Sequence, residues 1–592
     1  MLGIRSEQRG LFEADHLYLE YVGKDTFYGF LASQRGQLFS DEEFAELYCH
    51  DNGRDSVPPS LLSTVLLLQA HDKVSDEEAK ARADFDIRWK VALGIAVDER
   101  PFAKSTLQLF RSQLIVHEKV RSIFQRSLQL ARQTGYMKRH RMKAALDTSY
   151  ILGRGAVKDT YNLLADGIIQ VIRALATLES KKAEVWAKER GLERYFGSSV
   201  KGEADVDWDN EKSRHTFLQA IVNDADHVLE LARQARGQFA DGDSKREDIA
   251  GAAKLLGQLL LQDVAYREEG VALKEGVSPD RIVSVHDPEM RHGHKSSSNR
   301  FDGHKAVIAV DTDSQLITAV AVLPGNAPDN TGALELIAQS EENTGIEVEE
   351  TIADAAYGDG ATRQSFADAE RTLIAKVPAR PNKAYFPKED FEIDLETGTC
   401  TCPAGQVTQI KRRLKSHPDG RGGWLRQWGF VFDSRVCGAC MLRSKCVASK
   451  KDRGRTVSLH PQEALLQQAR LLQRSEVFAD YKKRRQVSEH RLARLMQLGM
   501  RQARYFGRTK TLFQLMMAAT VANLTLVVTS VGMMKKTSYK FAYFLALFRQ
   551  YAVSVVVRTV IGNFVQYPTN SLTSRTVIEI SLHGQGGYRL DF

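Results

Sequence analysis

The chain has 592 residues, of which 43% are hydrophobic and 26% are charged. This length predicts about three to five domain-sized units, and the composition is ordinary for a soluble globular protein, which makes a membrane protein the least favoured class. The formal net charge is +8, from 82 basic and 74 acidic side chains, and this balance fits a polyanionic partner without requiring one.

Residues 1–130 have the pattern of several short helices. Ser75 is followed three residues later by Glu78, which is the spacing of a helix-capping box. Another helix is expected to begin near Lys104. Short helices that carry basic residues fit a helix-turn-helix-like DNA-binding domain, and a plain helical bundle fits them equally well.

A basic segment containing Lys138, Arg139 and Arg141 comes next. Contact with phosphate groups is one interpretation of these cations, and a solvated charge run is the other. Residues 144–152 then have the pattern of a short strand with Asp147 in its middle. An acidic residue inside an apolar strand is costly to bury unless a partner such as a metal ion compensates its charge.

Residues 158–275 are rich in Glu, Lys, Arg, Ala and Leu, and we interpret them as a helical insertion. Residues 286–294 hold three histidines and two acidic residues. Their Gly and Pro content favours a mobile polar loop over a metal site. Two apolar β segments follow at 301–311 and 315–323, and the turn between them predicts a hairpin.

The stretch 351–360 holds the second acidic candidate. Apolar and polar residues alternate up to Ile352, which predicts a strand, and Asp354 follows where that strand ends. The end of a strand fixes a carboxylate while the loop keeps it reachable; a turn residue or a helix cap is the plain alternative. A helix at 361–370 and a strand at 372–377 complete the connectivity of a ribonuclease H-like α/β core.

Five of the six cysteines lie between residues 400 and 446. Because the chain opens on charged residues and not on an apolar signal segment, we expect a reducing, cytoplasmic compartment, where clustered cysteines bind metal more often than they form disulfides. Cys437 and Cys440 form a C-x2-C pair, and with Cys402 and Cys446 they offer four thiolates to a structural Zn²⁺. Free thiols remain the alternative, since the spacing is irregular.

A long helix is expected over residues 462–506. Tyr481, Arg485 and Glu489 are spaced four residues apart in it and therefore share one face. A surface salt bridge between the arginine and the glutamate is the plain interpretation. The uncharged stretch 511–534 is long enough to span a bilayer, but its polar residues favour a buried core helix.

Three acidic residues occupy matching positions in this fold. Phosphodiester cleavage requires charge neutralisation at the attacking and leaving oxygens, and two divalent ions about 3.5–4 Å apart, held by carboxylates, provide it. Asp147, Asp354 and Glu489 are expected to converge as such a set, with Asp159 and Asp359 as the nearest rivals. Arg485 and Tyr481 would then bind the phosphates of the cleaved strand.

Several blocks of sequence, in a fixed order, carry a resemblance to a known family. They are residues 147–164, 296–305, 353–360, the helix with Arg485 and Glu489, and residues 499–510. Over about residues 10–530 the chain resembles the DDE transposases of bacterial insertion sequences, in the broad IS4/IS5-like group and with most similarity to the IS1182 family. Two positions depart from the related pattern: Tyr481 lies one residue further from Arg485, and Met496 stands at the lysine position.

The resemblance implies an α/β fold with a ribonuclease H-like catalytic core, a helical N-terminal domain, a helical insertion and a Cys-containing insertion. It implies Asp147, Asp354 and Glu489 as ligands of Mg²⁺ (or Mn²⁺), and double-stranded DNA as substrate, both the terminal inverted repeats and the target. The reaction would be hydrolysis at the element's ends followed by attack of the freed 3′-hydroxyl on target DNA. Synapsis of two ends implies a homo-oligomer, and no membrane association is expected.

The expected domain organisation has seven segments. They are a helical N-terminal DNA-binding domain at 1–130, a first catalytic strand region at 131–157, a helical insertion at 158–285, a ribonuclease H-like core at 286–380, a Cys-rich insertion with a candidate zinc site at 381–460, C-terminal catalytic helices at 461–535 and a divergent tail at 536–592.

Two other functions remain open. A ribonuclease H-like nuclease would cut DNA without strand transfer. A domesticated, non-catalytic DNA-binding protein would use the helical N-terminus and the cysteine cluster. Residues 536–592 match nothing expected of the family, and such a tail raises the question of whether this copy is active.

Overall fold

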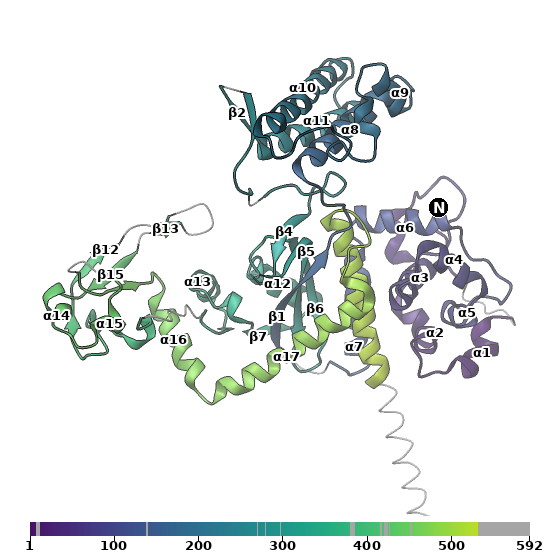
Figure 1. Ribbon diagram of the computed structural model, residues 1–592. Coiled ribbons are helices and arrows are strands. Elements are labelled where there is room, and N and C mark those ends of the chain that lie inside the picture. The colour runs from purple at the N-terminus through teal and green to yellow at the C-terminus, as the bar shows by residue number, and fades with distance from the viewer. Residues whose placement is uncertain are drawn as a thin grey trace, which may run out of the picture. The chain divides into compact units, whose positions relative to one another are not determined.

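A mixed six-stranded β-sheet forms the core of the protein in the computed structural model (Figure 1). Strand β1 pairs in parallel with β7 and antiparallel with β5, β7 pairs in parallel with β8, and one edge of β5 pairs antiparallel with both β4 and β6. The strand order is therefore β6–β5–β1–β7–β8, with β4 beside the first residues of β5. The bounds are β1 (Arg141–Leu152), β4 (Arg291–His294), β5 (Arg300–Asp311), β6 (Ile317–Pro324), β7 (Glu347–Ile352) and β8 (Leu373–Ile374).

The structure describes residues 1–530 except for short gaps at 7–11, 138–139, 269, 279, 297, 379–384, 415–416, 419–423, 426 and 450–452. The tail expected at 536–592 therefore lies outside the described residues. In the sheet, residues 306–310 of β5 are all buried, because β1 and β6 flank this strand. Helix α12 (Ala333–Thr344) packs on β5, β6 and β7, and helix α17 (Val477–Leu495) packs on β1, β5 and β7.

The N-terminal part is helical, as expected. Ser75 caps helix α4, since its side chain accepts a hydrogen bond from the amide of Glu78 at 3.1 Å, which confirms Ser75 as the N-cap, while the Glu78 carboxylate pairs with Arg82. The helices of this part are α1 (Ala14–Val22), α2 (Phe27–Leu38), α3 (Pro59–Asp72), α4 (Asp76–Phe85), α5 (Ile87–Leu93), α6 (Lys104–Val116) and α7 (Val120–Gln133).

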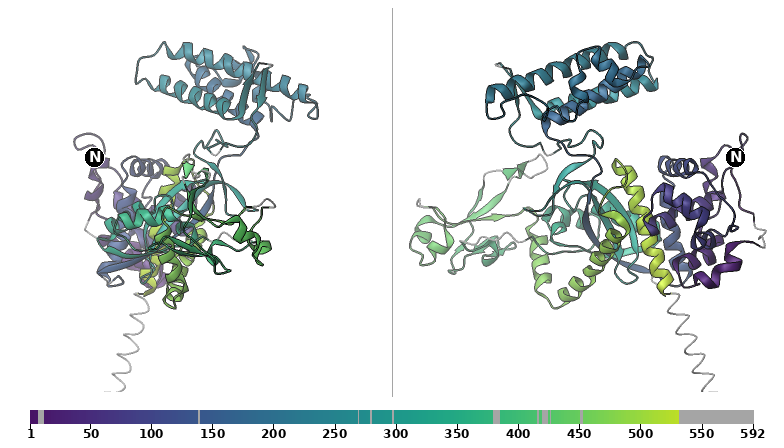
Figure 2. Two further views of the ribbon diagram at one scale, coloured as in Figure 1. Left: turned by 90° about the vertical axis from the view of Figure 1, so that its left-hand side faces the viewer. Right: turned by 45° about the vertical axis from the view of Figure 1, so that its right-hand side comes forward.

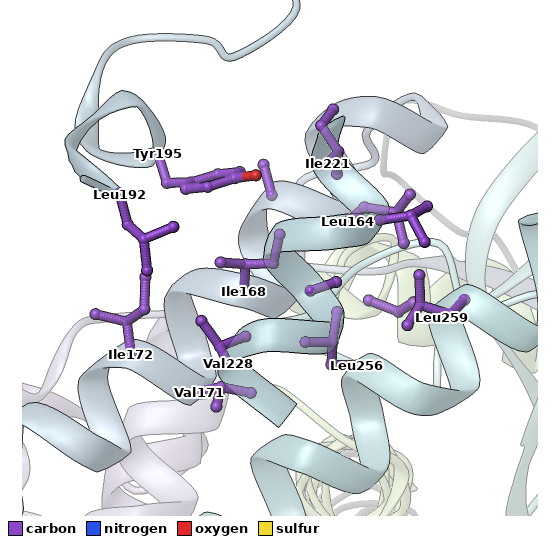
Figure 3. Close-up of a cluster of buried hydrophobic side chains, with 14 of the residues drawn as sticks. Leu164, Ile168, Val171, Ile172, Leu192, Tyr195, Ile221, Val228, Leu256 and Leu259 are labelled. Atoms are coloured by element: carbon purple, nitrogen blue, oxygen red, sulfur yellow. The ribbon is translucent and has the colours of Figure 1, made fainter. Parts of the chain in front are cut away.

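The segment between β1 and β4 is mostly helical and has its own core. Its helices are α8 (Thr160–Leu178), α9 (Ala183–Lys188), α10 (Glu211–Arg236) and α11 (Ser244–Asp263), and α8, α10 and α11 pack against one another (Figure 2). Figure 3 shows this core, where Leu164, Ile168, Leu256 and Leu259 are among the buried side chains. An insertion with a separate core can be added to a sheet without repacking it.

Two expectations for residues 158–294 are wrong. Residues 264–273, expected to be helical, form the hairpin of β2 (Val264–Arg267) and β3 (Gly270–Leu273), because Gly270 adopts a φ of +122°, which allows the reversal. Residues 286–294, expected to be a mobile loop, include strand β4 and the fully buried Asp287, which lies 3.4 Å from the buried His304 of β5. The free edge of β5 and this buried partner order the segment.

The cysteine-containing region folds into small sheets around Cys400 and Phe430, which are fully buried. Its elements are β9 (Glu392–Asp394), β10 (Thr399–Thr401), β11 (Val407–Thr408), β12 (Lys411–Arg413), β13 (His417–Pro418), β14 (Trp424–Leu425), β15 (Trp428–Val431), α14 (Ser434–Gly438), α15 (Arg443–Cys446) and β16 (Thr456–Leu459).

The single helix expected over 462–506 is wrong, since the chain forms two helices. Helix α16 (Glu463–Arg474) ends at Ser475, whose backbone is extended with ψ 153°, and α17 begins two residues later. A single π-helical turn (Met496–Met500) follows α17, and Gly499 leaves the helical path at φ +91°. A change of direction of this kind depends on tertiary packing and not on local propensity.

The last described helix, Arg508–Ser530, is long and apolar enough to cross a membrane. However, 78% of its most apolar window is buried inside the protein, and Asn523 both donates to and accepts from the backbone of Ile317 in β6. It is therefore a core helix, as we expected from the polar residues of the stretch 511–534. The last four residues of that stretch lie outside the described residues.

Candidate functional site

Strands β1 and β7 bring Asp147 and Asp354 to the same level of the sheet. Ala145 of β1 is paired in parallel with Ile352 of β7, and each aspartate lies two residues further along the chain. Because side chains alternate between faces with a period of two, both carboxylates leave the sheet on the same side. Asp354 also accepts a hydrogen bond from the amide of Ala356 at 2.9 Å and so caps a short 3₁₀ helix.

Helix α17 adds two charged side chains, those of Arg485 and Glu489, to the surroundings of Asp147. The hydroxyl of Ser488 donates to the Asp147 carboxylate at 3.3 Å, and the guanidinium of Arg485 lies 3.7 Å from the same carboxylate. Arg485 also donates a hydrogen bond to Glu489, one turn further along the helix. The helix face expected from the spacing of Arg485 and Glu489 therefore packs toward β1.

Asp147, Asp354, Arg485 and Glu489 all line one open cavity of about 470 Å³. Tyr481, one turn before Arg485, does not line it. The cavity wall has further polar and aromatic residues, contributed by β1, β4 and the residue after it, β5, the loop before α12 and the segment after α17: Thr148, Ser149, Tyr150, His294, Lys295, Phe301, Lys305, Asp329 and Arg501.

Burial dominates the electrostatics of the two aspartates. It raises the pKa of the Asp147 carboxyl to about 6; the amide of Thr148 and the charge of Arg485 oppose this rise, while Asp354 and Glu489 add to it. Burial also raises the pKa of Asp354, and the nearby charge of Asp329 adds to that rise. Negative charge is thus incompletely compensated here, which favours a bound cation or a proton.

The chemistry of these donors suits a hard divalent cation, since carboxylate oxygens are its preferred ligands. As the side chains stand, however, the described residues contain no group of three or more His, Cys, Asp or Glu close enough to hold a metal ion. Arg485, which pairs with both Asp147 and Glu489, takes up the carboxylate charge that such an ion would use. Two carboxylates therefore fit a metal role by chemistry and burial, and Glu489 would have to leave Arg485 to join them.

The rival aspartates are helix caps. Asp159 accepts from the amide of Tyr161 at 3.1 Å and begins α8. Asp359 accepts from the amides of Ala361 and Thr362 and begins α13 (Gly360–Asp368). Neither lines the cavity with Asp147, so the local capping roles account for both residues.

The four cysteines expected to bind zinc line one small cavity. Cys402, Cys437, Cys440 and Cys446 surround a volume of about 30 Å³, which is enough for one water-sized particle. Burial raises the pKa of the Cys446 thiol; Arg455 opposes this rise and the other three thiols add to it. Among the described residues, however, these thiols are not close enough together to bind one metal ion as they stand.

The structure describes only some of the basic residues that lead into β1. Lys138 and Arg139 lie outside the described residues, and Arg141 is exposed at the first position of β1 and does not line the cavity. Lys143 pairs with Glu350 of β7 at 2.8 Å. Lys143, which lies inside β1, thus helps to hold β1 and β7 together.

Sequence reasoning missed several residues of the cavity. Lys305 of β5 forms an ion pair of 2.7 Å with Asp329, which precedes α12, and Tyr150, Phe301 and Arg501 stack in a row. The signal was present for four of them, because Tyr150, Phe301, Lys305 and Arg501 lie inside the blocks that carry the family resemblance. Asp329 lies outside these blocks and had no such signal.

Two family models match the chain. The model described as a transposase DDE domain matches residues 401–528, and the model described as a transposase domain (DUF772) matches residues 19–113. The first range includes α17 with Arg485 and Glu489, and Asp147 and Asp354 precede it. No curated protein and no solved structure matches the chain.

Proposed function

From the premise that the chain is a transposase, with the pair of domains typical of the IS1182 family, we propose that it cuts DNA at the ends of an insertion sequence and joins those ends to target DNA. The observation that supports this most is the shared level of Asp147 and Asp354 on neighbouring parallel strands, with Glu489 on the helix that packs against them.

A ribonuclease H-like core is part of the proposal. The strand order β6–β5–β1–β7–β8, with β1, β7 and β8 parallel and the β5–β6 hairpin antiparallel, supports it. In a sheet of this kind the ends of β1 and β7 meet beside a helix that packs on the sheet, which is where the acidic cavity lies. The domain boundaries given above belong to the proposal, and the insertion at 158–285 then contains the hairpin of β2 and β3 beside its helices.

Each acidic residue has a defined role in this proposal. Asp147, Asp354 and Glu489 hold Mg²⁺ or Mn²⁺, which supplies charge neutralisation at the attacking and leaving oxygens of the phosphodiester. Asp147 must lose its proton to serve as a ligand, so it is competent above about pH 6. Arg485 exchanges its contacts with Asp147 and Glu489 for a phosphate of the cleaved strand.

Further DNA contacts belong to the same proposal. Helices α1–α6, which lie in or overlap the matched range 19–113, would bind the terminal repeats, and Tyr481, Lys138, Arg139 and Arg141 would contact phosphates of the DNA. Synapsis of two ends requires a homo-oligomer, and the expected compartment is the cytoplasm.

We propose separately that Cys402, Cys437, Cys440 and Cys446 hold a structural Zn²⁺. The supporting observation is that all four thiols surround the same small cavity. Four protein ligands close the coordination shell, so such an ion would stabilise the fold of the region and leave no position for substrate.

Strand transfer separates the proposal from its alternatives. The purified protein is incubated with Mg²⁺, a labelled duplex that ends in the terminal repeat, and a supercoiled target plasmid. A labelled product joined to the plasmid is expected. Cleavage without any joined product would support a plain nuclease, and binding without cleavage would support a non-catalytic DNA-binding protein.

A further inference from the structure

The backbone after α17 fixes Arg501 at the wall of the acidic cavity. Following the turn at Gly499, the chain runs beside the end of β1: the amide of Leu152 donates to the carbonyl of Arg501 at 2.9 Å, and the amide of Ala503 donates to the carbonyl of Leu152 at 2.8 Å. These two hydrogen bonds extend the sheet by a short segment. Arg501 is therefore anchored by its backbone while its side chain remains exposed.

The side chain of Arg501 lies on an aromatic stack. Its guanidinium carbon is 4.4 Å from the centre of the Tyr150 ring, and that ring stacks on the buried Phe301 at 5.0 Å between centroids and 28° between planes. A cation over a ring face is attracted by the ring quadrupole. The stack holds the guanidinium in one place while its N–H groups stay available for hydrogen bonds.

Two other cations of the cavity, Arg485 and Lys305, already have acidic partners, whereas Lys295 lies in the exposed segment after β4 and is not stacked on a ring of the described residues. Arg485 is paired with Asp147 and Glu489, and Lys305 is paired with Asp329. Within the described part of the chain, Arg501 has no acidic partner at ion-pair distance. A planar, exposed cation that is oriented by a ring and not by a carboxylate is suited to an external anion.

A cation in this position suits the binding of DNA. The acidic side of the cavity repels the phosphate backbone except where metal or arginine compensates it, and each phosphate contact from a basic side chain adds favourable binding free energy. We propose that Arg501 binds a backbone phosphate of the DNA strand that enters the cavity, and that Tyr150 positions the guanidinium for this contact. The inference rests on the proposed function and adds a phosphate subsite to the same cavity.

Equilibrium binding of repeat-end DNA in EDTA, measured at several salt concentrations, tests this inference without requiring catalysis. Arg501→Gln is expected to weaken binding by about tenfold and to reduce the slope of log affinity against log salt by about one. Arg494→Gln is the matched control, because Arg494 is a partly exposed arginine of α17 that does not line the cavity. It removes the same charge and is expected to change binding by less than about twofold.

Two variants of Tyr150 test the positioning role. Tyr150→Phe keeps the ring and is expected to retain most of the DNA affinity that Tyr150→Leu loses. If Arg501→Gln fails to fold, the comparison of these two Tyr150 variants tests the inference instead. Equal affinity and equal salt slope for Arg501→Gln and Arg494→Gln would overturn the inference. Failure of the proposed function is a separate observation, because the wild-type protein would then fail to cleave repeat ends in Mg²⁺ whatever stands at position 501.

Discussion

The guanidinium of Arg485 lies 3.7 Å from the carboxylate of Asp147. This contact joins helix α17 to strand β1, and the same guanidinium also binds Glu489. The compensation is incomplete, because burial still raises the pKa of Asp147 to about 6. Ionisation of Asp147 therefore lowers the free energy of unfolding, and a cation that binds the ionised carboxylate raises it again.

Replacing Asp147 by Asn is expected to stabilise the protein in EDTA at pH 8. The folded-state pKa of about 6 lies above the ordinary value of 3.8, so the folded protein binds this proton more tightly than the unfolded chain does. The ionised carboxyl consequently destabilises the fold above about pH 6, and the cost disappears below the ordinary pKa. Thermal melts should show a melting temperature about 2 °C higher for Asp147→Asn at pH 8 and no difference near pH 4. A less stable variant at pH 8 would contradict the argument.

Addition of Mg²⁺ is expected to raise the melting temperature of the wild-type protein at pH 8. A ligand that binds only the folded state stabilises it by mass action, and Asp354→Asn should abolish the rise because it removes a ligand of the ion. Differential scanning fluorimetry with a Mg²⁺ titration measures this.

The control for Asp354→Asn is Asp159→Asn. Asp159 caps α8, asparagine is an equally good cap, and the residue does not line the cavity, so the Mg²⁺ effect should persist. If Asp354→Asn and Asp159→Asn respond to Mg²⁺ alike, Asp354 is not a ligand. The rise should also shrink below about pH 6, where protons compete for Asp147.

The purified protein is expected to contain about one zinc ion per chain if the four thiols of the small cavity bind it. Metal analysis by mass spectrometry should show this ion in the wild-type protein and in Cys49→Ser, whose cysteine is exposed and outside the cluster. Cys437→Ser should lose it, together with stability of the region. If the purified wild-type protein contains no zinc and Cys437→Ser is as stable as the wild type, the four cysteines are free thiols.

Asp76 is expected to contribute to the stability of the matched N-terminal range at neutral pH. Although burial opposes it, pairing with Arg111 at 2.7 Å holds the pKa of Asp76 well below its usual range, and Arg504 lies 3.1 Å from the same carboxylate. Such a carboxylate contributes stability above its ordinary pKa, and this contribution is lost as the pH falls below it. Asp76→Asn should therefore lower the melting temperature at pH 7, with the difference narrowing below about pH 4. Equal melting temperatures at pH 7 would show that the network is not stabilising.

The positions of Asp147 and Asp354 could be predicted because each depends on a local pattern: an apolar strand around one residue and a strand end before the other. Glu489 was proposed as the third carboxylate of the set, and the family resemblance supported it, since a helix face with an arginine and a glutamate is common. The capping of α4 by Ser75 was equally local. In each of these cases the signal lies within a few residues of the position it concerns.

The features that could not be predicted depend on distant partners. Strand β4 forms because β5 offers a free edge, and Asp287 is buried because His304 lies opposite it. The break between α16 and α17 at Ser475 has no proline or glycine to mark it. The row of Tyr150, Phe301 and Arg501 joins three segments far apart in the chain, so no periodicity within one segment indicates it.

Metal-dependent cleavage at a defined position tests the central claim most directly. Labelled DNA that carries the terminal repeats flanking the gene is incubated with the wild-type protein and with Asp354→Asn, in Mg²⁺ and in EDTA. The account predicts nicking at the repeat boundary that requires Mg²⁺ and falls by about 10³-fold in the variant, because a lost metal ligand removes several kcal/mol of transition-state stabilisation. Cleavage at an equal rate by Asp354→Asn, or cleavage that persists in EDTA, would contradict it.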